Sequence, residues 1–241
     1  MQIEWPPVTF NPEDFNPRNI LESYFDVGIV ISQWDVILQA TLVTISLALL
    51  AEVFGIALGL ILALMKISRS RILSAPAQVY IDVFRGTPLL VQITIIYFTP
   101  ASIGIRPESL FFAGLVALTL NSAAYVAEIF RAGIQSIDKG QMEAGRASGL
   151  SYAQTMRYII VPQAFRRVIP PLTNEFVMLI KDTSLVSVIG LVELLRAAQE
   201  IQSQTFNSSA LIAAALIYLA ICLPLIYLTN VLERRLNRRT A

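Results

Sequence analysis

The sequence predicts an all-α integral membrane protein, and two observations lead to this fold class. The first is composition, because 55% of the 241 residues are hydrophobic and only 15% are charged, whereas soluble proteins average about 25% charged residues. The second is clustering, because the apolar residues gather in runs long enough to cross a bilayer core of about 30 Å as helices. Together they predict a bundle of several transmembrane helices.

The residue types that the chain lacks exclude several kinds of chemistry. There is no His and only one Cys, Cys222, which excludes an internal disulfide, a zinc site and a Cys–His catalytic pair. Neither a GxxxxGK[ST] phosphate-binding loop nor a nucleophile elbow occurs. The formal net charge of +1 gives no reason to expect a nucleic-acid partner. We therefore expect no catalytic residue, no metal site and no cofactor in this chain.

Residues 1–33 form an N-terminal segment ahead of the first apolar run. Four prolines between residues 6 and 17 break helical structure early, whereas apolar residues recur beside acidic ones from Ile20 to Ile31. One interpretation is an amphipathic helix at the membrane interface, with Trp5 and Trp34 as anchors. The other interpretation is a solvated tail.

Residues 34–236 are expected to form one transmembrane domain with five spans. The predicted spans are Val36–Met65, Gly86–Ile105, Leu110–Ala127, Val168–Val192 and Ile201–Leu232. Pro88 and Pro100 suggest boundaries or kinks in the second span. The fourth span carries charged residues, so it crosses lipid only if its polar face lies inside a bundle. Gly55 and Gly59 give the first span a small-residue face that lets another helix approach closely.

The distribution of basic residues predicts the orientation. With five spans, the basic residues after the first span, in the long loop and in the C-terminal stretch Glu233–Ala241, which includes the tail 237–241, fall on one side of the membrane: Lys66, Arg69, Arg71, Arg131, Lys139, Arg146, Arg157, Arg166, Arg167, Arg234, Arg235, Arg238 and Arg239. The other side holds the acidic N-terminus, a short turn at Arg106 and an external connection over 193–205. The positive-inside rule therefore places the N-terminus outside and the C-terminus in the cytoplasm.

The polar loop at about 138–165 is predicted to form two short helices with a sharp break. Asp138 can cap the first helix, and Gly149 can close it in the left-handed conformation. Ser151 and Gln154 match a capping box at the start of the second helix. Pro162, which lacks a backbone N–H, is expected to end that second helix.

This loop resembles the EAA loop of permease subunits of binding-protein-dependent ABC importers. The matching residues are Glu143, Ala144, Gly145, Gly149, Ile159, Val161 and Pro162, with Gly145 and Val161 as small departures from the pattern. Three further stretches resemble the polar amino-acid group of that family, the histidine-, glutamine- or arginine-type permeases. They are FRGTPLL at 84–90, NSAAYVAEIFRAG at 121–133 and KDTSL at 181–185.

The resemblance implies a multi-pass protein of the bacterial inner membrane that imports polar amino acids. It implies two cytoplasmic ATP-binding subunits, which bind Mg-ATP, a second permease copy or a homologous permease, and an extracytoplasmic amino-acid-binding protein. The loop would be the cytoplasmic coupling helix, contacting the ATPase through Glu143, Ala144, Gly145, Arg146, Gly149 and Leu150. The alternative function is an ion-driven secondary amino-acid transporter, which usually shows internal repeats that are not evident here.

Polar residues at membrane depth are the candidates for the substrate path. Asn121, Ser122, Tyr125 and Glu128 form a polar line along one predicted helix. Their alternative role is hydrogen bonding between helices, with Glu128 paired to Arg131. Further candidates lie in the fourth span: Glu175, Lys181, Asp182, Thr183 and Ser184. Their alternative role is a structural network, and Lys181 and Asp182 can also mark a local break in the helix.

One more charged residue, Arg85, is expected at the cytoplasmic mouth of the path. Asp82 lies three residues before it, so a surface ion pair between the two side chains is the simplest expectation.

Overall fold

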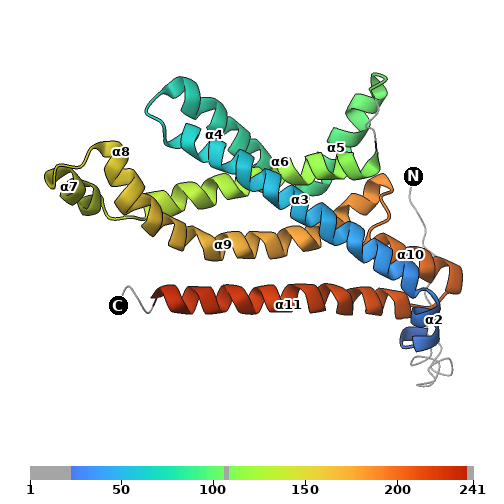
Figure 1. Cartoon of the computed structure of the whole chain (residues 1–241). Coiled ribbons are helices and arrows are strands. Elements are labelled where there is room, and N and C mark those ends of the chain that lie inside the picture. The colour runs from blue at the N-terminus through green and yellow to red at the C-terminus, as the bar shows by residue number, and fades with distance from the viewer. Residues whose placement is uncertain (1–22, 106–108, 238–241) are drawn as a thin grey trace, which may run out of the picture.

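The computed structural model describes residues 23–105 and 109–237, which form helices and no strand (Figure 1). The elements are α2 Val27–Ser32, α3 Trp34–Ile67, α4 Arg71–Gly86, α5 Leu89–Ser102, α6 Leu110–Gln135, α7 Lys139–Ala147, α8 Tyr152–Thr155, the π-helical turn η2 Met156–Ile160, α9 Val161–Asp182, the 3₁₀ segment η3 Thr183–Ile189, α10 Leu194–Thr205 and α11 Ser209–Asn237. Trp5, the turn at Arg106 and most of the basic tail lie outside the described residues.

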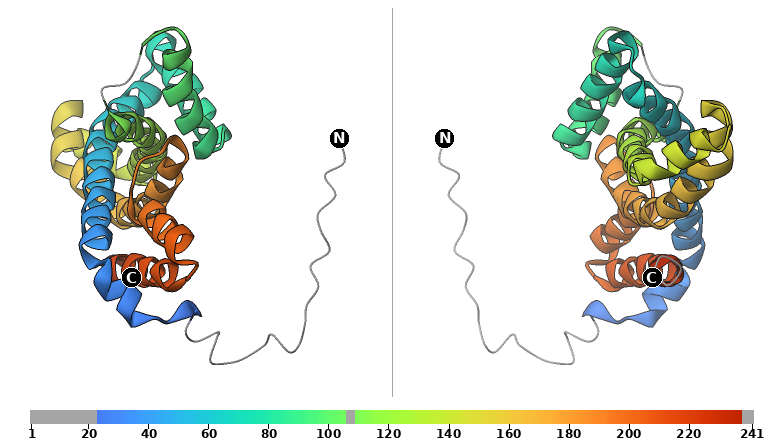
Figure 2. Two further views of the ribbon diagram at one scale, coloured as in Figure 1. Left: turned by 90° about the vertical axis from the view of Figure 1, so that its right-hand side faces the viewer. Right: turned by 90° about the vertical axis from the view of Figure 1, so that its left-hand side faces the viewer.

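Three of the described helices are long and apolar enough to cross a membrane: α3, α6 and α11. The pair α4–α5 passes the same test only together, bent by 107° at the residues between them, which would make a fourth span. The predicted span Gly86–Ile105 therefore needs correction, because Pro88 marks the start of a 14-residue helix and the other half of the pair is α4. Figures 1 and 2 place α4 and α5 on one side of the α3–α6 pair and α11 on the other.

The contact between α3 and α6 forms the centre of the bundle. It is made by small and aliphatic residues, including the buried Leu47, Ala51, Ala117 and Leu118. A Cβ atom added at Gly55 would lie 2.5 Å from the Ser122 Oγ atom, and one added at Gly59 would lie 2.6 Å from the Val126 Cγ1 atom. The small-residue face predicted for the first span is thus confirmed, and α6 is the helix that it admits.

The predicted span Ile201–Leu232 is wrong at its start. Residues 201–205 belong to α10, the chain reverses at Phe206 with φ +52°, and α11 begins at Ser209. The Asn207 side chain accepts a hydrogen bond from the Ser209 N–H at 2.9 Å, which suits a helix start. Residues 201–232 carry no charged side chain, and sequence alone therefore merged the two helices, although the polar run 202–205 and 207–209 lies at the turn. Ile201 and Ala210, on either side of the turn, are buried in the same cluster.

At the other end of α10, Glu193 is the N-cap residue, in the connection between η3 and α10. Its side chain is fully buried and accepts hydrogen bonds from the Leu195 N–H at 2.9 Å, the Arg196 N–H at 2.7 Å and the Tyr218 hydroxyl at 2.9 Å. Burial raises the pKa of this carboxyl above its ordinary value, and the three hydrogen bonds oppose that rise. Glu193 therefore caps α10 and also fixes it to α11.

One of the two interpretations of the N-terminal segment was an amphipathic helix over Ile20–Ile31. Of that stretch, α2 covers the part from Val27 on, and residues 20–22 lie outside the described part of the chain. Asp26 is the N-cap of α2, and its Oδ1 atom accepts hydrogen bonds from Gly28 and Ile29. A residue expected on the acidic face of a helix is thus the residue that starts it. The Asp26 N–H donates to the Ser209 hydroxyl at 2.7 Å, so the N-terminal segment is attached to the start of α11.

Candidate functional site

A cleft of about 660 Å³ lies between α4, α6 and α9. Its polar lining includes Arg85 from α4, Tyr125 and Glu128 from α6, and Arg167, Asn174 and Glu175 from α9. Charged, amide and aromatic groups from three helices therefore meet at one opening. Such a set can bind a solute that carries both a carboxylate and an amino group.

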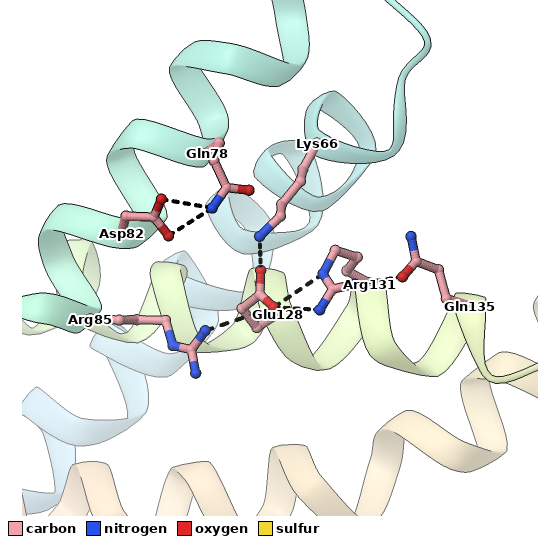
Figure 3. Close-up of polar contacts among 7 residues, drawn as sticks. All are labelled: Lys66, Gln78, Asp82, Arg85, Glu128, Arg131 and Gln135. Atoms are coloured by element: carbon pink, nitrogen blue, oxygen red, sulfur yellow. Dashed lines mark hydrogen bonds and ion pairs between the residues drawn. The ribbon is translucent and has the colours of Figure 1, made fainter.

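Glu128 is the centre of an ion network at this cleft (Figure 3). Its carboxylate contacts the Lys66 ammonium from α3, the Arg131 Nη2 atom at 2.7 Å and the Arg85 Nη1 atom at 3.7 Å. The Glu128 side chain is 15% exposed, whereas that of Arg85 is 44% exposed. One carboxylate thus serves three cations, which leaves a surplus of positive charge beside the cleft.

The expected ion pair between Asp82 and Arg85 is wrong. Asp82 accepts two hydrogen bonds from the Gln78 amide, each 2.7 Å long, while Arg85 points across to α6 (Figure 3). The guanidinium also lies 5.4 Å from the centre of the Tyr125 ring, a distance suited to a cation–π contact. The Arg85 guanidinium group therefore lies at the cleft, in contact with Glu128 and Tyr125.

Two predicted path residues on α6 bind other helices. The Asn121 amide, 6% exposed, donates to the Gln92 Oε1 atom of α5 at 2.9 Å. The buried Ser122 hydroxyl donates to the Glu52 Oε2 atom of α3 at 3.2 Å. The structure thus gives Asn121 and Ser122 the alternative role of hydrogen bonding between helices. Tyr125 and Glu128, one and two turns further along, line the cleft.

Sequence reasoning missed Glu52 and Gln92. Glu52 is 7% exposed, and within the described residues its Oε1 atom has no hydrogen-bond partner. A lone acid inside a predicted membrane span is a signal that could have found it. Gln92 carries no such signal, because an uncharged amide is common in a polar face of a helix. Its role depends on the bend next to it, which only the structure shows.

Of the polar candidates in the fourth span, Glu175 lines the cleft, whereas the run Lys181–Ser184 lies apart from it. Lys181 and Ser184 line a second groove of about 450 Å³ between α9, α10 and α11. Thr183 is buried and donates to the Ile180 carbonyl at 2.6 Å. Asp182, the last residue of α9, lines neither of these two clefts. The predicted break is confirmed, since the α-helix ends at Asp182 and 3₁₀ geometry begins at Thr183.

The loop over 138–165 folds largely as its sequence predicts. Asp138 caps α7 through the Gly140 N–H at 2.7 Å, Gly149 has φ +86°, and Ser151 with Gln154 forms the capping box. Gly145 is buried, and a Cβ atom there would lie 2.5 Å from the Thr155 Cγ2 atom. The remaining α7 residues singled out above, Glu143, Ala144 and Arg146, are exposed. The α7 helix therefore rests on α8 through Gly145 and presents the other three to the outside.

Pro162 does not end the second helix of the loop. The chain passes from α8 through the π turn η2 into α9, and Pro162 lies in the first turn of α9. A proline is tolerated in a first turn, where its missing N–H leaves no helical bond unmade. The π turn supplies this new start, because the Val161 N–H donates to the Met156 carbonyl five residues back.

The membrane-spanning helices, the polar cleft and the exposed loop define a membrane transport subunit. The chain belongs to the family of binding-protein-dependent transport system inner membrane components, whose model matches residues 55–238. It is thus a permease subunit of the inner membrane.

Individual relatives agree with this membership. The chain is 41% identical over 214 residues to the arginine transport system permease protein ArtQ of Bacillus subtilis, covering 88% of this chain and 97% of that one. It is 43% identical over 212 residues to the L-cystine transport system permease protein TcyB of the same organism, with coverage of 87% and 90%. A solved structure described as an amino acid ABC transporter with histidines matches with a TM-score of 0.82 and 42% identity, covering 87% and 98%.

Proposed function

We propose that this permease forms the translocation path of an ATP-driven importer of polar amino acids. The observation that carries the proposal is the combination of an amphoteric cleft with the exposed α7 helix in one chain. Relatives named for arginine and L-cystine transport, and a structural neighbour described with histidines, support the substrate class.

In this proposal the chain crosses the membrane five times, through α3, the bent pair α4–α5, α6, α9 with η3, and α11. The N-terminus lies outside, and the α7 loop and the C-terminus lie in the cytoplasm, as the distribution of basic residues indicates. The polar α9 crosses as a span because α6 and α11 pack on it and shield part of its surface from lipid.

The cleft between α4, α6 and α9 binds the amino acid on its way across. Arg85 is placed to receive the α-carboxylate, and Glu175 with Asn174 is placed to receive the ammonium group. Glu128 holds Arg85 at the cleft, and its own charge is already shared with Lys66 and Arg131. Lys181 and Ser184 belong to a later or earlier stage of the path, because they line the second groove.

The energy comes from partner chains. Two cytoplasmic ATPase subunits bind Mg-ATP and hold the α7 helices of two permease chains, either identical or homologous. An extracytoplasmic binding protein delivers the amino acid. Glu143, Ala144 and Arg146 form the exposed face for the ATPase, and Gly145, Gly149 and Leu150 give the loop its shape.

The test is co-purification of the permease with its ATPase, comparing Gly149→Asp with Gly104→Asp. Both glycines have positive φ, +86° and +84°, and neither position crowds an added Cβ atom. The two variants therefore carry the same added charge and a similar backbone strain. We expect Gly149→Asp to lose the ATPase and Gly104→Asp to retain it.

A second measurement is amino-acid uptake by vesicles that contain the permease. We expect uptake to require the ATPase, ATP and the binding protein. A wild-type permease that binds no ATPase, yet takes up amino acids under an ion gradient alone, would instead be an ion-driven secondary transporter.

A further inference from the structure

The bend between α4 and α5 leaves carbonyls in the last turn of α4 without helical donors, and the Phe84 carbonyl is one of them. The α4 helix ends at Gly86, Thr87 is extended, and Pro88 precedes α5. In a continuous helix the N–H of residue 88 would donate to the Phe84 carbonyl, but proline has no N–H. The Phe84 carbonyl is partly buried, so another donor is expected for it.

The Gln92 side chain supplies that donor from the first turn of α5. Its Nε2 atom donates to the Phe84 carbonyl at 2.8 Å and also contacts the Thr87 hydroxyl at 2.8 Å and the Thr87 carbonyl at 3.1 Å. Gln92 is 7% exposed. One side chain therefore joins the last turn of α4, the bend and the first turn of α5.

The other end of the same amide joins the bend to α6. The Gln92 Oε1 atom accepts the hydrogen bond from Asn121 described above, in a buried position. A second bond nearby connects α4 to α6, since the Tyr80 hydroxyl donates to the Leu120 carbonyl at 2.7 Å. Both halves of the bent pair, α4 and α5, are thus bound to α6 at the adjacent residues Leu120 and Asn121.

Arg85 follows directly after the residue that Gln92 holds. Its guanidinium extends from the last turn of α4 to Tyr125, one helical turn after Asn121, and to Glu128. A rotation of the α4 end about its axis would carry Arg85 away from both partners. The position of the cleft cation therefore depends on the amide pair at the bend.

We propose that Gln92, together with Asn121, is a positioning residue of this permease. The pair keeps the α4–α5 bend in register with α6 and thereby keeps Arg85 at the cleft, without contacting the solute. This inference rests on the proposed function for its effect on transport. Its structural part, the control of the bend, stands independently of what is transported.

The structural part is tested by the distance between spin labels at Ile72 and Phe98. These residues are exposed and lie near the far ends of α4 and α5. The labels are attached to Ile72→Cys and Phe98→Cys in a Cys222→Ala background, in complexes diluted with unlabelled permease. We expect one narrow distance distribution, broadened at least two-fold by Gln92→Leu or Asn121→Leu. The matched control is Gln78→Leu, which removes a partly exposed amide of α4 that hydrogen-bonds to Asp82 of the same helix. An unchanged distribution in Gln92→Leu would overturn the proposal, whatever the transport data show.

The functional part is tested with the complete importer in proteoliposomes, as amino acid moved per ATP hydrolysed. We expect Gln92→Leu to lower this ratio at least five-fold, while the ATPase rate stimulated by binding protein stays within two-fold of wild type. Gln92→Glu, which retains the acceptor for Asn121, should lower it less. In an Arg85→Ala background, Gln92→Leu should have no further effect. An additional loss there would refute action through Arg85, and a wild-type complex without ATP-dependent uptake would refute the proposed function instead.

Discussion

The Lys66 ammonium at the end of α3 contacts the Glu128 carboxylate of α6 (Figure 3). The two helices also pack closely at Gly55 and Gly59. The ion pair at Lys66 therefore adds a charged contact to this close packing, further along α3. The carboxylate also binds Arg131 on its own helix and Arg85 on α4. Glu128 therefore joins three helices at the edge of the cleft.

Replacing Glu128 by Gln should destabilise the fold strongly. The substitution leaves three cations close together without their shared anion. Because Glu128 and Lys66 are mostly buried while Arg85 and Arg131 are partly exposed, we expect a cost of about 1–3 kcal/mol, between the values for exposed and for buried pairs. The measurement is the free energy of unfolding of the permease in detergent. Glu200→Gln is the control, because the Arg196–Glu200 pair is 43% exposed on both sides and should cost at most ~0.5 kcal/mol. Equal losses in the two variants would contradict the network.

Gly59→Ala should weaken the contact between α3 and α6. The added Cβ atom would lie 2.6 Å from a Val126 side-chain carbon and 2.9 Å from the Ala123 carbonyl oxygen, and the backbone atom cannot move aside cheaply. We expect a loss of about 1–3 kcal/mol in the same unfolding measurement. Gly86→Ala meets no atom within 4 Å and should leave the stability unchanged.

Glu52→Gln should leave the protein as stable as wild type or make it more stable. A carboxylate that is 7% exposed, with one oxygen lacking a partner among the described residues, carries a desolvation cost that a neutral amide avoids. The amide oxygen can still accept the hydrogen bond from Ser122. The check is the thermal unfolding midpoint. A marked decrease in this midpoint would contradict the prediction, because it would mean that the Glu52 carboxylate has a cationic or hydrogen-bond-donating partner.

Two substitutions in the loop should distinguish a residue that contacts the ATPase from one that the fold of the loop requires: Glu143→Lys and Gly145→Val. Glu143 is exposed, so reversing its charge should weaken ATPase binding at least ten-fold while the unfolding midpoint stays constant. The Gly145 Cβ position lies 2.5 Å from Thr155, so Val should lower both binding and the midpoint. ATPase binding is measured by co-purification and by titration. Loss of stability in Glu143→Lys would contradict its placement on the surface.

The loop was the most predictable part of the chain because its structure is set by residues close in sequence. The cap at Asp138, the positive φ at Gly149 and the capping box of Ser151 and Gln154 each involve contacts within three residues. Pro162 was misjudged because a proline suits the first turn of a helix as well as the position after one. Only the π turn before it decides between the two.

The cleft could be predicted only in part. Glu128 and Arg131 are three residues apart, so their ion pair follows from helical spacing, whereas Lys66 and Arg85 reach Glu128 through tertiary packing. Asn121 and Ser122 were recognised as polar residues at membrane depth. Their partners, Gln92 and Glu52, are 29 and 70 residues away, and no local pattern connects such positions. The boundary between α10 and α11 was missed because no charged residue lies between 201 and 232, although polar residues flank the turn at Phe206.

The path from the loop to the cleft is helical throughout. From Tyr152 to Ile189 the chain passes through α8, η2, α9 and η3 without an irregular residue, and α7 rests on this stretch through Gly145. In mechanical terms, α7 lies against one end of this continuous helical stretch, and the cleft wall that carries Glu175 lies further along it. We expect a displacement of α7 to be transmitted along α9, and Thr87–Pro88 and Phe206 are non-helical positions at which the other helices can adjust to it.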